Sequence, residues 1–175
     1  MKSKLPRRLF VAVAVISLVV GVGIPDASAA GTAGTDGFRA ARMLPAGNST
    51  NTGHTAFATI QANEPDHAGD PPGATVWWKY RRTNTRNVRL SLNGSNFDTI
   101  LAVYRGPNLA NLTEVASNDD ASVPSSPLWS RLEFTAQANV TYRIVVGGYG
   151  ASAPIDGDER RGAYKLTVTV LPPAV

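Results

Sequence analysis

Carboxylates gather in the loop 63–70 (NEPDHAGD), where their types and spacing could bind a metal ion. An earlier aspartate could join this loop, so the candidate ligands are Asp36, Glu64, Asp66 and Asp70. Calcium takes six to eight oxygen ligands, so these carboxylates with carbonyl groups and water would suit it. The alternative is a loop held by carboxylate-to-backbone hydrogen bonds, with His67 packed and hydrogen-bonded within it.

A second acidic stretch, Asn118-Asp119-Asp120, is a weaker candidate metal site. Asp and Asn side chains also hydrogen-bond the backbone two residues further on, so the same residues favour a tight turn. Asp98 precedes the apolar run 100–103, and we interpret it as an acceptor of backbone N–H groups where a strand begins.

Catalytic motifs are scarce in this chain. It has two histidines and no cysteine, and it lacks the nucleophile-elbow, zinc-protease and phosphate-loop patterns. We therefore expect no enzyme. Two carboxylates in a cleft could still hydrolyse a glycoside, so the alternative is a secreted hydrolase, or a hydrolase-associated propeptide, that uses acids among Asp66, Asp98 and Asp119.

One aromatic group could bind a ligand directly. Trp77 alternates with Trp78 and Tyr80, so the two indoles point to opposite faces of a strand. If Trp77 is exposed beside Arg81 or Arg82, these three residues could contact a sugar ring or a matrix protein. The alternative is that both tryptophans are buried, because large apolar rings usually are.

The first 29 residues have the pattern of an export signal. Four basic residues precede the apolar stretch Leu9–Val20, and Ala27-Ser28-Ala29 supplies small residues for cleavage. The apolar stretch has twelve residues, whereas a membrane span needs about 20. We expect a secreted, extracellular product that starts near Ala30 and has no membrane span; an uncleaved anchor is the alternative.

Charge gives no support for nucleic-acid binding. Residues 30–175 carry 13 basic and 12 acidic side chains, so the alkaline character of the whole chain belongs largely to the signal. No basic run longer than Arg81-Arg82 or Arg160-Arg161 remains. The absence of cysteine excludes disulfides and thiolate metal sites.

Period-two alternation dominates the rest of the chain and predicts an all-β fold. Val88, Leu90 and Leu92 alternate with polar residues, and similar patterns occur at 74–80, 131–134, 142–146 and 164–170. Strands at 55–61 and 112–116 and in the run after Asp98 bring the total to about eight. Two facing antiparallel sheets would bury the apolar side of each strand.

The expected domain boundaries follow from these patterns. Residues 36–44 (DGFRAARML) have helical spacing and predict one short N-terminal helix, capped by Asp36 and ended by Pro45. Residues 30–35 are expected to be a flexible leader, 36–171 a single β-sandwich domain, and 172–175 a tail.

Several motifs, in order, resemble the bacterial pre-peptidase C-terminal domain family. They are EPDHAG at 64–69, TVWW at 75–78, FDTILAVYRG at 97–106 and LTEVASNDD at 112–120, with DGF at 36–38 and YRIVVGGY at 142–149. The resemblance covers roughly residues 35–170. It implies a jelly-roll-like sandwich, similar to the collagen-binding domains of secreted proteases and usually a non-catalytic accessory to a secreted enzyme.

Family members differ in what they bind. Some bind calcium through acids near the N-terminal linker and the loop before the next strand, and others are proposed to bind matrix protein or polysaccharide. This chain has Ala74-Thr75-Val76 where calcium-binding relatives tend to place an aspartate pair. We therefore expect a secreted module that binds an extracellular protein or polysaccharide, with calcium as a possible cofactor; a structural extracellular protein is a further alternative.

Overall fold

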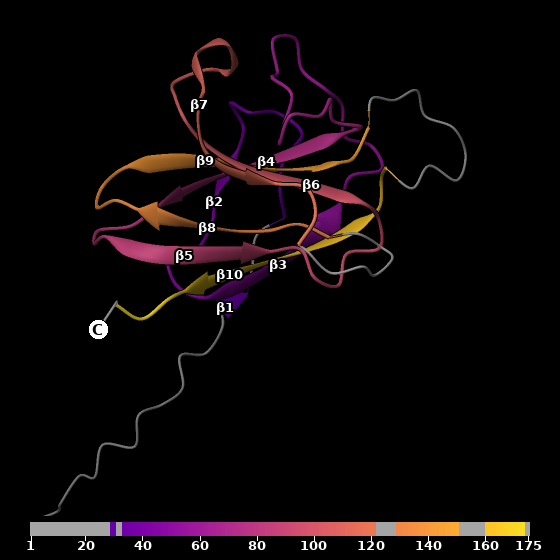
Figure 1. The fold of residues 1–175 in the computed structure, drawn as a ribbon. Coiled ribbons are helices and arrows are strands. Elements are labelled where there is room, and N and C mark those ends of the chain that lie inside the picture. The colour runs from indigo at the N-terminus through magenta and orange to yellow at the C-terminus, as the bar shows by residue number, and fades with distance from the viewer. Residues whose placement is uncertain (1–28, 31–32, 122–128, 151–159, 174–175) are drawn as a thin grey trace, which may run out of the picture.

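The computed structural model describes residues 29–30, 33–121, 129–150 and 160–173. Almost all regular structure in these residues is β-strand, arranged in two stacked sheets (Figure 1). One sheet has the order β1 (Ala29–Ala30), β3 (Ser49–His54), β10 (Ala163–Val170), β5 (Arg86–Ser91), β8 (Arg131–Ala136). The other has the order β2 (Arg42–Met43), β4 (Thr75–Arg81), β9 (Thr141–Gly148), β6 (Thr99–Arg105), β7 (Thr113–Asn118).

The eight longer strands form the predicted antiparallel sandwich. Only the two-residue strands pair in parallel, β1 with β3 and β2 with β4. The expected all-β, two-layer architecture with about eight strands is confirmed. No helix within the described residues is long and apolar enough to cross a membrane. The predicted signal segment, apart from Ala29, lies outside the described residues.

Alternating side chains build the core between the two sheets. Val88 and Leu90 of β5 are fully buried and face Phe134 and Leu132 of β8, whereas Arg89 points outward to solvent. Burial of each such aliphatic side chain contributes about 1.5–3 kcal/mol relative to exposure. The period-two pattern therefore predicted the inward faces correctly.

A second apolar layer covers the outer face of the β2–β4–β9–β6–β7 sheet. Its members are Phe38, Ala41, Trp77, Ala102, Tyr104 and Val145, all buried. This cover explains why β6 is apolar on both faces, because its alternate side chains enter the two layers in turn. The segments that supply the cover also line a hollow described below.

The predicted N-terminal helix is wrong. Residues 38–40 form a single turn, closed by a bond from the Ala41 N–H to the Phe38 carbonyl, and the chain then pairs with β4 as strand β2. The apolar residues Phe38 and Ala41 are buried on the sheet. Tertiary packing and edge pairing therefore override a weak local helical preference.

Two other local expectations also fail. The strand expected at 55–61 lies six residues earlier, as β3, while Thr55–Ala58 forms a turn. The leader is not free in residues 33–35: the Gly34 N–H donates to the Tyr164 hydroxyl at 2.8 Å, and Thr35 forms a β-bridge with Trp77.

Candidate functional site

Three aspartates meet at one end of the β2–β4–β9–β6–β7 sheet. We call Asp98, Asp119 and Asp120 the acidic corner. Asp98 immediately precedes β6 and Asp119 immediately follows β7, and these antiparallel neighbours pair Leu101 with Asn118. A carboxylate oxygen from each aspartate lies within 4.8 Å of the other two. Hairpin pairing therefore brings together acids that are more than twenty positions apart in the sequence.

The electrostatics of the acidic corner favour a bound cation. Oδ1 of Asp119 is buried with no hydrogen-bond donor in the described residues, although the residue as a whole is partly exposed. Burial, and then repulsion from Asp120, Asp98 and Asp70, raises the pKa of Asp119 to about 6. A divalent cation would remove this repulsion and supply a partner for the buried oxygen.

The turn at Asn118 shapes the acidic corner. The side-chain amide of Asn118 donates to the Asp120 carbonyl at 2.9 Å, and its oxygen accepts the Arg131 N–H at 2.8 Å. The predicted turn chemistry is confirmed. It does not compete with metal binding, because it uses the asparagine and leaves the Asp119 and Asp120 carboxylates to face the corner.

The corner fits calcium by the chemistry of its donors. It offers only oxygen ligands, from Asp98, Asp119 and Asp120, with the charge of Asp70 close enough to perturb Asp119. Calcium prefers such hard oxygen ligands, and backbone carbonyls or water complete its shell. Bound there, calcium would supply charge neutralisation and would cross-link β6 to β7.

The predicted loop site does not assemble. Among the described residues, the acidic corner is the only group of three or more metal-binding side chains with ligand atoms this close together. Asp36 instead accepts bonds from the N–H and hydroxyl of Thr59, and Asp66 is exposed. Of the four predicted ligands, Asp70 alone is close enough to Asp119 to affect its pKa.

The Glu64 carboxylate is part of a buried hydrogen-bond network. Its carboxylate accepts the Trp77 indole N–H at 3.2 Å and the Gln61 N–H at 2.9 Å, and it pairs with His67 Nε2 at 3.2 Å. Burial raises the pKa of Glu64, but its hydrogen bonds outweigh this effect and hold the pKa below the ordinary value. These hydrogen bonds fix the Glu64 carboxylate within the loop.

His67 completes this network. The imidazole is fully buried, and its Nδ1 lies 2.8 Å from the Tyr104 hydroxyl, which also donates to Glu114 on β7 at 3.3 Å. Burial, reinforced by Glu114, raises the pKa of Tyr104 and keeps it protonated. The alternative expectation, a loop pinned by hydrogen bonds with His67 packed inside, is therefore confirmed.

The predicted aromatic contact site is wrong. Trp77 is fully buried under Phe38, in an edge-to-face contact with ring centroids 5.2 Å apart, so it offers no stacking surface. Arg81 is exposed and reaches Asn139, whereas Arg82 is tied to the Ala46 carbonyl and to Asn84. The outer layer of segments 36–44 and 61–70 was not visible in the strand pattern, and it covers the indole.

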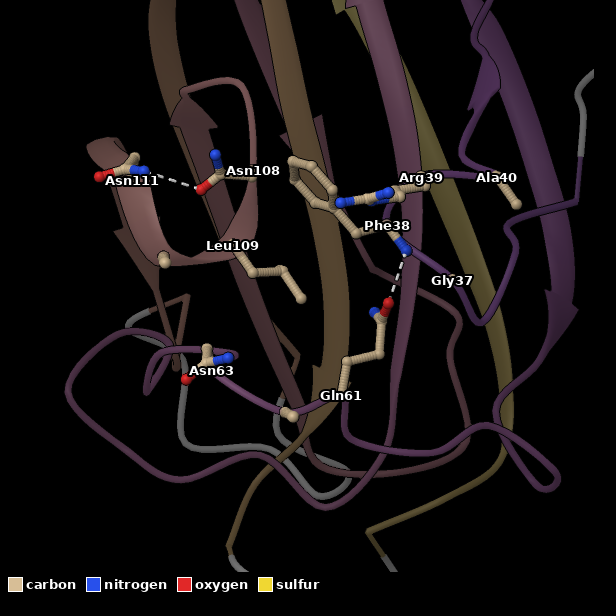
Figure 2. A pocket seen from close by; sticks show the side chains of 11 residues that line it. Gly37, Phe38, Arg39, Ala40, Gln61, Asn63, Asn108, Leu109 and Asn111 are labelled. Atoms are coloured by element: carbon tan, nitrogen blue, oxygen red, sulfur yellow. Dashed lines mark hydrogen bonds between the residues drawn. The ribbon is translucent and has the colours of Figure 1, made fainter.

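A hollow of about 570 Å³ lies beside this outer layer, a size typical of ligand-binding pockets. Three segments line it, residues 37–40, 61–63 and 108–111, as Figure 2 shows. Gln61 connects two of them, because its side chain accepts the Phe38 N–H at 3.1 Å and donates to the Asp36 carbonyl at 3.2 Å. Leu109 points into the space between Phe38 and Gln61 (Figure 2).

Gly106 permits the wall formed by residues 108–111. Its φ of 147° lies in a region that side chains rarely adopt, and the Asn111 carbonyl occupies the place where a Cβ would stand. Only glycine closes this loop so tightly. The residues of the hollow were missed in the sequence, because three short segments far apart in the chain build it and none has a recognised motif.

Comparison with known proteins finds similarity among solved structures. No protein family and no curated protein sequence matches the chain. Among solved structures, the pre-peptidase C-terminal domain of a collagenase from Bacillus anthracis matches with 16% identity and a TM-score of 0.41, covering 83% of this chain and 100% of that domain. The solved domain belongs to the family that the order of motifs in this chain resembles.

Proposed function

We propose that this chain is an exported, non-catalytic module that binds an extracellular polymer, either a matrix protein or a polysaccharide, in association with a secreted peptidase. The observation that carries this proposal is the hollow beside the outer layer. It is a preformed concave surface whose wall carries the side chains of Arg39 and Asn63, and neither makes a hydrogen bond within the described residues. Groups of this kind are available to a ligand, and the mechanism is contact without bond cleavage.

We further propose that calcium stabilises the module by binding at the acidic corner. The support is the proximity of the three carboxylates, the buried Asp119 Oδ1 and the raised pKa of that residue. A cation there would fix the end of β6 against the end of β7. The effect of calcium on polymer binding would be indirect. The hollow lies by the 3₁₀ helix Leu109–Asn111, which connects β6 to β7, whereas the acidic corner lies at the opposite end of this β6–β7 hairpin.

A carboxylate-dependent hydrolase is the second candidate, and one observation favours it. Asp119 has a pKa of about 6 and lies beside Asp98, and such a pair can divide acid and base duties. Asp66, the third acid proposed for this chemistry, lies instead near Tyr104. A second hollow, of about 580 Å³, is lined by residues 56–60, Gly73 and Arg161. Neither this hollow nor the one of about 570 Å³ includes Asp98 or Asp119 in its lining.

Co-sedimentation with insoluble collagen, chitin, cellulose and polygalacturonate gel tests the proposal. We expect the protein to be retained on at least one of them, with no release of soluble peptides or sugars. Failure to bind any extracellular polymer would contradict the proposed function. Release of fragments by the wild type, abolished in Asp119→Asn, would establish the hydrolase instead.

A further inference from the structure

Two cationic side chains without a carboxylate partner among the described residues lie in or beside the hollow. Arg39 lines it, is exposed and makes no hydrogen bond within the described residues. The Arg143 guanidinium lies 4.2 Å from the centroid of the Phe38 ring, which lines the hollow, and donates to the Phe38 carbonyl.

Ion pairs do not neutralise these cations. In the part of the chain that the structure describes, the ion pairs are Glu64 with His67 and Arg89 with Glu133. Asp36, next to the hollow, is bound to Thr59, and Glu114, on the neighbouring edge strand, accepts bonds from Tyr104 and Ser117. The Arg39 guanidinium is therefore a positive charge in the hollow that forms no ion pair within the described residues.

Neutral polar groups complete the lining. Asn63 has a φ of 65° and an amide side chain with no hydrogen bond in the described residues. The side-chain NH2 of Asn111 donates to the side-chain oxygen of Asn108 at 3.0 Å. The side-chain NH2 of Asn108 and the side-chain oxygen of Asn111 remain available to a ligand. Leu109 provides an apolar surface between these groups (Figure 2).

We propose that the hollow binds a polysaccharide whose sugar units carry carboxylates, that is, a chain of uronic acids. This inference rests on the proposed function and specifies its ligand. Arg39 can form a charge-assisted pair with the carboxylate, often through two parallel N–H···O bonds. Amides both donate and accept, as sugar hydroxyls require, and Leu109 can contact the C–H face of a ring.

An acidic peptide is the competing ligand, and the lining makes it less suitable. A peptide carboxylate would use the guanidinium equally well, but a glutamate side chain has no hydroxyl groups to pair with the amides of Asn63 and Asn108. A buried polar group that loses its water without gaining a partner opposes binding. Comparing a polyuronate with poly-glutamate therefore separates the two.

Titration calorimetry of the full mature protein with galacturonate oligomers tests the proposal. We expect binding that weakens as salt is added, and an affinity loss of about tenfold or more in Arg39→Gln, as the removal of one charge-assisted bond implies. Asn63→Gly keeps the left-handed backbone and removes the amide, and it should weaken binding severalfold. Lys165→Gln is the matched control, because Lys165 is an exposed cation of the other sheet, and it should bind as the wild type does.

The other outcomes overturn the inference in distinguishable ways. Unchanged affinity in Arg39→Gln, with a wild-type melting curve, would place the contact elsewhere. Binding of dextran or poly-glutamate as tightly as galacturonate oligomers would remove the uronate specificity. Retention on collagen or cellulose without any binding of galacturonate oligomers would overturn this inference and leave the proposed function standing, whereas failure to bind any polymer would remove both.

Discussion

Lys79 and Arg143 stand directly opposite one another on β4 and β9, so two cationic side chains are direct cross-strand neighbours. Cross-strand neighbours have Cβ atoms about 4.5–5.5 Å apart, and like charges at this distance are destabilising. Arg143 is also partly desolvated, and this burial lowers its pKa. The sheet therefore carries an electrostatic cost at this cross-strand pair.

Replacing Lys79 by glutamate should stabilise the protein. The like-charge pair becomes an opposite-charge pair, with an expected gain of about 0.2–1 kcal/mol in the free energy of unfolding at low salt. Urea unfolding measures it, and added salt should reduce the gain. Lys165→Glu is the control, because Lys165 faces the neutral Thr52. An equal gain in both variants would show that net charge, and not the cross-strand pair, is responsible.

The acidic corner should make stability depend on pH in the absence of calcium. The folded state holds the Asp119 proton up to about pH 6, whereas an unfolded aspartate loses it near pH 4. The folded state thus binds more protons in this window, so this contribution is present at low pH and is lost as the pH rises from about 4 to about 6. With a chelator present, Asp119→Asn should remove this component, which we expect to be about 1 kcal/mol after allowance for solvent screening.

Asp66→Asn is the control for this pH effect. Asp66 is exposed and lies outside the acidic corner, so its substitution should leave the dependence of the melting temperature on pH unchanged. The same pH curve in wild type and Asp119→Asn would show that the corner carboxylates do not repel one another as the geometry indicates.

Calcium should raise the melting temperature of the wild type and reverse that pH trend. At a hundredfold excess over its dissociation constant, a ligand that binds only the folded state adds about 2.7 kcal/mol. Calcium needs ionised ligands, so the gain should shrink below about pH 6, where Asp119 is protonated. Differential scanning calorimetry with calcium or chelator measures it. An unchanged melting curve at pH 7.5, or an equal shift in Asp119→Asn, would contradict a calcium site at the corner.

The buried network around Glu64 should be essential for stability. Glu64→Ala leaves the Trp77 indole N–H and the Gln61 N–H without their acceptor, and each unsatisfied buried group costs about 1–3 kcal/mol. We expect a total loss of about 2–4 kcal/mol by urea unfolding. Glu114→Ala, an exposed carboxylate at the edge of the same network, should cost less than about 1 kcal/mol. Equal losses would show that the buried bonds are not what stabilises the loop.

The sandwich was predictable from the sequence because its strands are locally encoded. Val88, Leu90 and Leu92 alternate with polar residues, and such alternation has one geometrical interpretation, a half-buried strand. The short segments 36–44 and 55–61 were misjudged because their apolar residues fit more than one local structure. Packing of Phe38 and Ala41 against Trp77 and Val145 decided the first case, and pairing with β10 decides where β3 lies.

The candidate sites were less predictable because they depend on register and on distant segments. Asp98 and Asp119 meet because β6 and β7 pair as antiparallel neighbours, with Leu101 opposite Asn118. The hollow requires three loops to converge, and the side chains that line it are common loop residues such as Asn63 and Asn108. Individual acids could be named from the sequence, but their grouping could not.

Hydrogen–deuterium exchange with and without polygalacturonate tests most directly the claim that the module acts by contact at the hollow. We predict slower amide exchange in residues 37–40, 61–63 and 108–111, no comparable change on β5 and β8, and a polymer of unchanged chain length. Protection confined to β5 and β8, or a shortened polymer, would contradict the account.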